Sequence, residues 1–118
     1  MTEPLTFERR IMDGVPVISL RGEVDFVSVP GLRDRIAREI SPAHSGVVLD
    51  LTQTSYVDSA GVHFLVELCE SLAAHRQRLW LVVPDGSPVR RLAFIAGLDG
   101  LMRIEPTVEA AVAGLRQS

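Results

Sequence analysis

The sequence predicts an α/β fold in which a mixed β-sheet is covered by crossover helices. Three observations lead to this prediction. Asp13-Gly14 separates two strand-like runs near the start, which is a strong hairpin signal. Two later apolar runs, residues 45–51 and 78–83, do not alternate, which is typical of strands buried on both faces. Segments with apolar residues at helical spacing separate the runs, so the strands after the hairpin are expected to be parallel, with right-handed crossovers.

The elements are expected in the order β-β-α-β-α-β-α-β-α. The antiparallel hairpin strands cover residues 5–12 and 15–20, and the second strand ends at Gly22. A helix is expected over residues 28–40. Ser28 would cap that helix, and Pro30 would lie in its first turn, where a missing N–H costs nothing.

The rest of the chain continues the alternation. We expect the following elements, given by residue range: a strand at 45–51, a helix at 59–77, a strand at 78–83, a short helix at 88–98, a strand at 101–104 and a helix at 107–115. The helix at 59–77 carries an apolar stripe that includes the single cysteine, Cys69, which we therefore expect to pack as a small hydrophobic side chain.

Composition fits one ordinary globular domain spanning residues 1–118. The chain has 47% hydrophobic and 23% charged residues, and its net charge of −3 with no basic stripe gives no reason to expect a nucleic-acid partner. All 12 basic residues are arginine, and the absence of lysine excludes a Walker-type phosphate loop and a Schiff base. We expect no cofactor and no metal, since the three histidines are scattered.

The location is expected to be cytoplasmic. One cysteine cannot form an internal disulfide, which suits a reducing compartment. The start of the chain lacks a secretory signal, and no apolar run reaches the length of a membrane span, so direct membrane insertion is not expected.

Ser59 follows Asp58 at the expected junction between a strand and a helix. Three interpretations of Ser59 are open. Either residue could be the helix cap. Ser59 as a nucleophile is disfavoured, because Val57 replaces the first glycine of a nucleophile elbow and His63 lies on the same helix. The chain is therefore not expected to be an enzyme, and a serine hydrolase is the rejected alternative.

The third interpretation makes Ser59 an acceptor of phosphate. A phosphoryl group at a helix N-terminus meets backbone N–H groups and the positive end of the helix dipole. Asp58 is adjacent in sequence and Asp25 follows another strand, so their like charges would oppose the phosphate. A helix N-terminus flanked by acidic residues can hold a phosphate, and its surface charge changes sharply when the serine is modified. A switch requires such a change.

Three segments together resemble the STAS family, in particular the stand-alone bacterial anti-sigma factor antagonists. They are "RGEVDFVSVPGLR", "VVLDLTQTSYVDSAGV" and "VRRLAFIAGLDGLMRI", with Phe94 in the last. The resemblance covers nearly the whole chain and implies a STAS-like mixed sheet. It departs from many antagonists at Val62-His63, where they have a leucine and a second glycine.

The resemblance implies a function in partner switching during transcription regulation and stress responses. The unphosphorylated protein would bind an anti-sigma factor that is a serine kinase, and so release the sigma factor. That kinase would phosphorylate Ser59, which would switch binding off until a serine phosphatase removed the phosphate. The alternative is a STAS subunit of a lipid-transport or other membrane-associated assembly that is not phosphorylated.

The partner is expected to bind one contiguous surface made of residues 23–28 and 56–63, because loops at the carboxyl ends of parallel strands gather at one edge. Charge reversal at Asp25 or bulk at Gly61 is expected to impair binding while the fold survives. The residues assigned to this surface around Ser59 are Glu23, Asp25, Ser28, Asp58, Ala60, Gly61, Val62 and His63.

Overall fold

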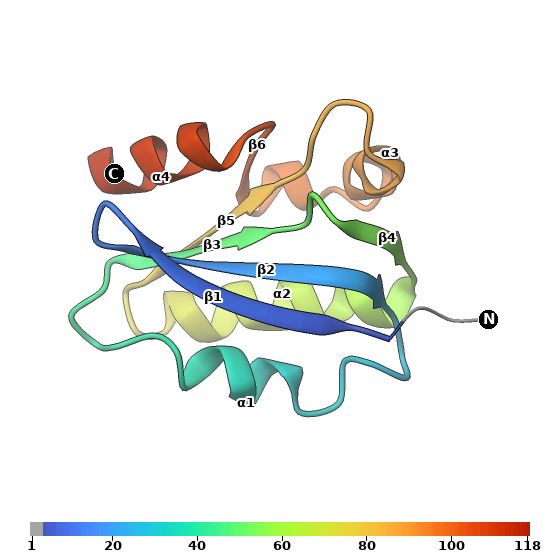
Figure 1. Cartoon of the computed structure of the whole chain (residues 1–118), viewed down its shortest axis with the longest axis horizontal. Coiled ribbons are helices and arrows are strands. Elements are labelled where there is room, and N and C mark those ends of the chain that lie inside the picture. Colours follow the sequence, from blue (N-terminus) through green and yellow to red (C-terminus); the bar gives the residue numbers. More distant parts are fainter. Residues whose placement is uncertain (1–3) are drawn as a thin grey trace.

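The computed structural model of the chain describes residues 4–118 and shows a six-stranded sheet between helices (Figure 1). The strands are β1 (Thr6–Met12), β2 (Val15–Val24), β3 (Gly46–Asp50), β4 (Thr54–Val57), β5 (Arg78–Val82) and β6 (Arg103–Glu105). The helices are α1 (Leu32–Ala37), α2 (Ser59–Ala73), α3 (Pro88–Ile95) and α4 (Val108–Gln117), with a 3₁₀ turn, η1, at Leu98–Gly100.

The sheet is mixed, as predicted. Its order is β1-β2-β3-β5-β6, with β4 paired to β2 off this path. Only β1 is antiparallel to its neighbour, and every other pairing is parallel. The predicted hairpin is present, because Asp13 and Gly14 both have positive φ angles, of 51° and 81°, as a type I′ turn requires.

The strands β3 and β5 send alternate side chains into two hydrophobic clusters. Val47 and Leu49 of β3 face the larger cluster, which includes buried residues of α1, α2 and α3. Val48 of β3 and Trp80 of β5 face the smaller cluster, which α4 covers. Figure 1 shows the same arrangement, with α1 and α2 on one side of the sheet and α4 on the other. The non-alternating apolar runs therefore correspond to strands covered on both faces.

The first predicted helix is shorter and starts later than expected. It begins at Leu32, and Gly31 occupies the N-cap position in the left-handed conformation, with φ of 80° and no side-chain cap. Ser28 is therefore not a helix cap, and Pro30 lies before the helix rather than in its first turn. The reason is local: the Ser28 hydroxyl is held by the loop after β2, where it donates to the Glu23 carbonyl at 2.8 Å.

The strand β4 was not predicted, and β2 runs further than predicted. Residues 52–55 are polar and β4 has only four residues, so its pattern in the sequence is weak. Gly22, the expected end of the second strand, has a φ of 112° and sits at a register shift. The strand continues through this irregularity to Val24 and pairs there with β4. This extension positions the candidate site.

Candidate functional site

The two segments expected to form one surface do lie together. The end of β2 pairs in parallel with β4, with Glu23 opposite Tyr56 and Val24 opposite Val57. The pairing continues past both strands, because the Asp58 N–H donates to the Val24 carbonyl at 3.3 Å. We call residues 23–28 and 56–63 the Ser59 surface.

Asp58, and not Ser59, caps α2. Its Oδ1 accepts a hydrogen bond from the Gly61 N–H at 2.9 Å, and its backbone is extended. Its Oδ2 accepts from the Phe26 N–H at 3.2 Å, so the same carboxylate also fixes the loop after β2. Ser59 is the first residue of the helix and is exposed. Its side chain is therefore not needed for capping and is available to solvent.

The side chains of Asp25 and Ser28 form hydrogen bonds within the loop after β2. The Asp25 side chain is only 9% exposed, and its Oδ1 accepts from the Val27 and Ser28 N–H groups at 3.1 and 3.0 Å. Ser28 Oγ accepts from the Asp25 N–H at 2.9 Å. Charge reversal at Asp25 would break these bonds, so the variant is expected to disturb this loop as well as any partner contact.

Gly61 is required for the close packing of α2 on the sheet. A Cβ added there would lie 2.3 Å from the Val24 carbonyl oxygen and 2.7 Å from Val57 Cγ1. The glycine is buried, so bulk at this position disturbs the fold before it can reach a partner. Bulk at Gly61 is therefore expected to lower stability as well as to affect partner binding.

Of the remaining predicted residues, Ala60 and His63 line a groove between α1 and α2, whereas Val62 and Glu23 do not. His63 is exposed and its Nε2 lies 3.6 Å from Glu67 Oε1, one helical turn away. Ala60 and Val62 are half-buried, and Glu23 is also half-buried on β2. The groove has a volume of about 310 Å³, and its lining comprises Val29, Pro30, Gly31, Arg33, Asp34, Ala60, His63, Phe64 and Glu67.

Three exposed apolar side chains of the Ser59 surface were not singled out from the sequence. Phe26 and Val27 are each 72% exposed and Tyr56 is 51% exposed. The signal for Phe26-Val27 was a consecutive apolar pair directly after a strand, in a loop that no core can cover. Exposed aromatic side chains next to an exposed serine are suited to burial by a protein partner.

The geometry around Ser59 gives no support to nucleophilic catalysis or to a metal centre. Within residues 4–118, no histidine is hydrogen-bonded to the Ser59 hydroxyl, and the nearest along α2, His63, pairs with Glu67. In the same part of the chain, no cluster of three or more histidine, cysteine, aspartate or glutamate side chains is placed to hold a metal ion. What the arrangement offers is an exposed hydroxyl at a helix N-terminus within a partly apolar surface.

The fold and this helix start define a class of protein. The STAS domain family matches residues 6–111, and the chain belongs to that family. Among the described residues, none of the helices combines the length and the apolarity needed to cross a lipid bilayer.

Relatives of the chain are anti-sigma factor antagonists. The chain is 29% identical over 104 residues to the anti-sigma-F factor antagonist RsfB of Mycobacterium tuberculosis, a match that covers 88% of this chain and 84% of RsfB. A crystal structure of an anti-sigma factor antagonist from Mycobacterium paratuberculosis has a TM-score of 0.83 and 27% identity, over 98% of this chain and 99% of that one.

A third relative has been solved in two states. Unphosphorylated SpoIIAA, an anti-sigma factor antagonist, has a TM-score of 0.72 and 27% identity, over 96% of this chain and 98% of its own. The phosphorylated form of SpoIIAA, a cell fate determinant from Bacillus, has a TM-score of 0.65 and 26% identity, over 94% and 100% of the two chains.

Proposed function

We propose that this chain is an anti-sigma factor antagonist whose affinity for its partner is set by phosphorylation of Ser59. The observation that carries the proposal is the exposed Ser59 hydroxyl at the first position of α2, directly after the capping Asp58. Antagonist relatives with at least 25% identity, one of them solved in a phosphorylated form, support it. The partner would be an anti-sigma factor with serine kinase activity, in the cytoplasm.

The partner would bind the Ser59 surface. Phe26, Val27 and Tyr56 supply exposed apolar area around the hydroxyl, and burial of such side chains drives association. The loop that carries Phe26 and Val27 is held rigid by Asp25 and Asp58, so little conformational entropy is lost when it binds. The chain itself would act as a binding protein and substrate, not as an enzyme.

The switch would follow from charge. The kinase transfers the γ-phosphoryl group of ATP to Ser59 Oγ, the hydroxyl proton is released and ADP leaves. The phosphate adds about −1.5 to −2 charges next to Asp58 at neutral pH. A loss of ~3 kcal/mol of binding free energy would weaken the complex by about two orders of magnitude. A serine phosphatase would hydrolyse the phosphate and restore binding.

The fold should tolerate the modification. Because Asp58 supplies the cap, a phosphate on Ser59 leaves the bond between Asp58 and the Gly61 N–H in place. The helix dipole and the first-turn N–H groups stabilise an anion there by roughly 0.3–1 kcal/mol. The phosphorylated protein is therefore expected to remain folded while it loses its partner.

The experiment begins with affinity capture from the native cell, using the unmodified chain as bait. Recovery of a kinase that also binds a sigma factor supports the proposal, whereas recovery of a permease or transport ATPase supports the membrane-associated alternative. The captured kinase is then purified and incubated with the chain and Mg-ATP. Wild type should gain one phosphate on Ser59 and dissociate.

Two variants and one matched control complete the test. Ser59→Ala should bind the kinase and stay bound in Mg-ATP, and Ser59→Asp should bind poorly. Ser55→Ala removes the side-chain oxygen of another exposed serine, four residues earlier on β4, and should still be released from the kinase by phosphorylation as wild type is. Mass spectrometry that places the phosphate on Ser55 or Ser71, or tight binding by Ser59→Asp, would contradict the proposal.

A further inference from the structure

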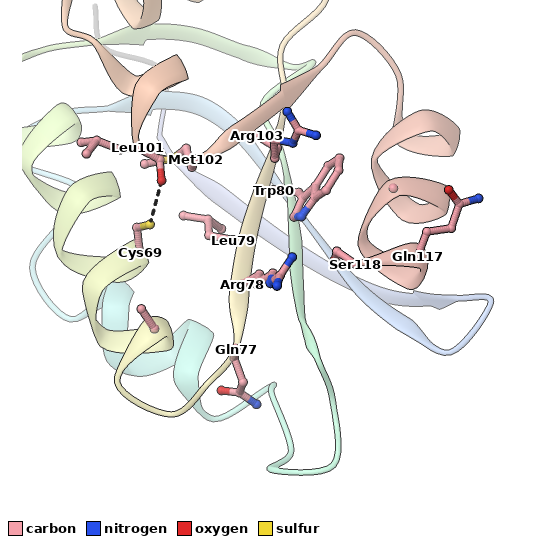
Figure 2. Close-up of a pocket in the computed structure, with 12 residues that line it drawn as sticks. Cys69, Gln77, Arg78, Leu79, Trp80, Leu101, Met102, Arg103, Gln117 and Ser118 are labelled. Atoms are coloured by element: carbon pink, nitrogen blue, oxygen red, sulfur yellow. Dashed lines mark hydrogen bonds between the residues drawn. The ribbon is translucent and has the colours of Figure 1, made fainter.

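A sizeable cavity lies away from the Ser59 surface. It has a volume of about 550 Å³ and opens between the C-terminal half of α2, the strands β5 and β6, and α4 (Figure 2). The cavity exists because β6 has only three residues and first pairs with β5 at Trp80. The preceding β5 residues, Arg78 and Leu79, therefore have no β6 neighbour. The volume lies within the range of small-molecule sites.

The polar part of this cavity is cationic. Arg78 and Arg103 both line it, and their guanidinium groups flank the Trp80 ring in Figure 2. The Arg103 guanidinium carbon lies 5.5 Å from the centroid of that ring. Within residues 4–118, no carboxylate lies within ion-pair distance of either arginine, and no acidic side chain is among the lining residues. The other polar lining residues are Gln77, Gln117 and Ser118, so the two arginines are the charged side chains of this lining.

The other walls of the cavity are apolar. Leu79, Met102 and Trp80 are largely buried side chains whose edges face the cavity, and Leu101 is 58% exposed at its rim. Cys69 lies on the α2 side, where its thiol donates to the Leu101 carbonyl at 3.7 Å. Burial, with a smaller contribution from Glu70, raises the pKa of the Cys69 thiol, so this wall remains neutral at pH 7. The arginines and Trp80 thus lie on the α4 side of β5, and Leu79, Met102 and Cys69 lie on the α2 side, so the cationic and apolar linings meet at the free edge of β5.

We propose that this cavity binds a small amphipathic organic anion. A carboxylate, sulfonate or phosphate head would lie beside the Trp80 ring and accept paired hydrogen bonds from the planar guanidinium group of Arg78 or Arg103. An aromatic or acyl body would extend across the free edge of β5, where β6 is absent, toward Leu79 and Met102 on the α2 side. The site is at the far end of α2 from Ser59, and its occupation does not depend on the antagonist function.

The test uses the full chain and a pair of matched fluorescent probes. The anion 8-anilinonaphthalene-1-sulfonate and the uncharged N-phenyl-1-naphthylamine share the same ring framework. Trp80 is the only tryptophan, and energy transfer from it reports that the probe is bound to the protein, while the variants below locate the site. The sulfonate should bind saturably at one site, and the uncharged probe at least about tenfold more weakly, since it leaves both arginines without an anion.

Arginine variants locate the head group. Arg78→Gln and Arg103→Gln should each weaken sulfonate binding about tenfold, as expected for loss of one charge-assisted contact. Arg78→Lys and Arg103→Lys keep the charge and should retain more of the affinity. Arg91→Gln removes one exposed charge from α3, outside the cavity, and should bind as wild type. Thermal melts of each variant show whether the fold is kept.

Competition and protection complete the test. Dodecanoate and dodecyl phosphate should displace the probe. Their relative potency shows whether the site prefers a carboxylate or a phosphate head. Dodecanol and inorganic phosphate should not compete. The bound probe should also slow alkylation of Cys69, the only thiol. Equal affinity for both probes, wild-type affinity in the folded Gln variants, or binding of an extended peptide but of no amphipathic anion would overturn the proposal.

Discussion

Both oxygens of the Asp58 carboxylate accept backbone hydrogen bonds, one from Gly61 in the first turn of α2 and one from Phe26 in the loop after β2. Asp58→Ala removes both acceptors and should lower the free energy of unfolding by about 2 kcal/mol. Asp58→Asn keeps one acceptor oxygen, so it should lower the free energy of unfolding by about half as much. Ser59→Ala, one residue away, should change stability by no more than ~0.5 kcal/mol. Urea unfolding with a constant m-value measures each change.

The same prediction separates the two interpretations of the helix start that the sequence left open. A cost for Ser59→Ala equal to that for Asp58→Ala would mean that Ser59 is the cap after all. The sequence located the Asp58-Ser59 pair at the helix start because the strand signal before it and the apolar stripe after it are strong. It could not assign the cap, because both residue types serve equally well. At Ser28 the same ambiguity led to a wrong assignment, since a loop competed for the hydroxyl.

The elements most visible in the sequence were those with long apolar patterns, namely β2, β3, β5 and α2. The short strand β4 was missed because pairing with β2, rather than its own composition, makes it a strand. The strand β4 is also what places Tyr56 and Val57 beside Glu23 and Val24. The contiguity of the Ser59 surface was predicted from the general rule for parallel strands, but its detailed contacts depend on an element that the sequence showed only weakly.

The contact between α2 and β2 should be the least tolerant of added volume. Gly61→Ala places a methyl group 2.3 Å from the Val24 carbonyl oxygen, so either the helix or the strand must move. We expect the free energy of unfolding to fall by about 1–3 kcal/mol. Gly86→Ala is the matched control, because a Cβ there meets nothing within 4 Å, and it should change stability by less than ~1 kcal/mol. Chemical denaturation of the two variants measures both changes. An equal loss of stability in Gly61→Ala and Gly86→Ala would contradict the packing argument.

The two proposed sites of the molecule lie toward opposite ends of α2. Ser59 is its first residue, and Cys69 at the edge of the cavity comes ten residues later. At about 1.5 Å per residue this is a separation of roughly 15 Å along the helix axis. The Debye length at physiological ionic strength is about 8 Å, so a charge at the exposed Ser59 is largely screened at the cavity. No shared loop joins the two sites, because the Ser59 surface is fixed by β2 and β4 and the cavity by β5, β6 and α4.

This separation predicts that the two sites act independently. Ser59→Asp, or enzymatic phosphorylation of Ser59, should change the affinity for 8-anilinonaphthalene-1-sulfonate by less than about twofold at physiological salt. Ser59→Ala is the uncharged control for the substitution itself. Because coupling between binding sites is reciprocal, saturating probe should likewise leave the affinity for the proposed anti-sigma factor partner unchanged. A shift of fivefold or more in both titrations would show that α2 transmits a change between its ends, and the cavity would then be a regulatory input to the switch.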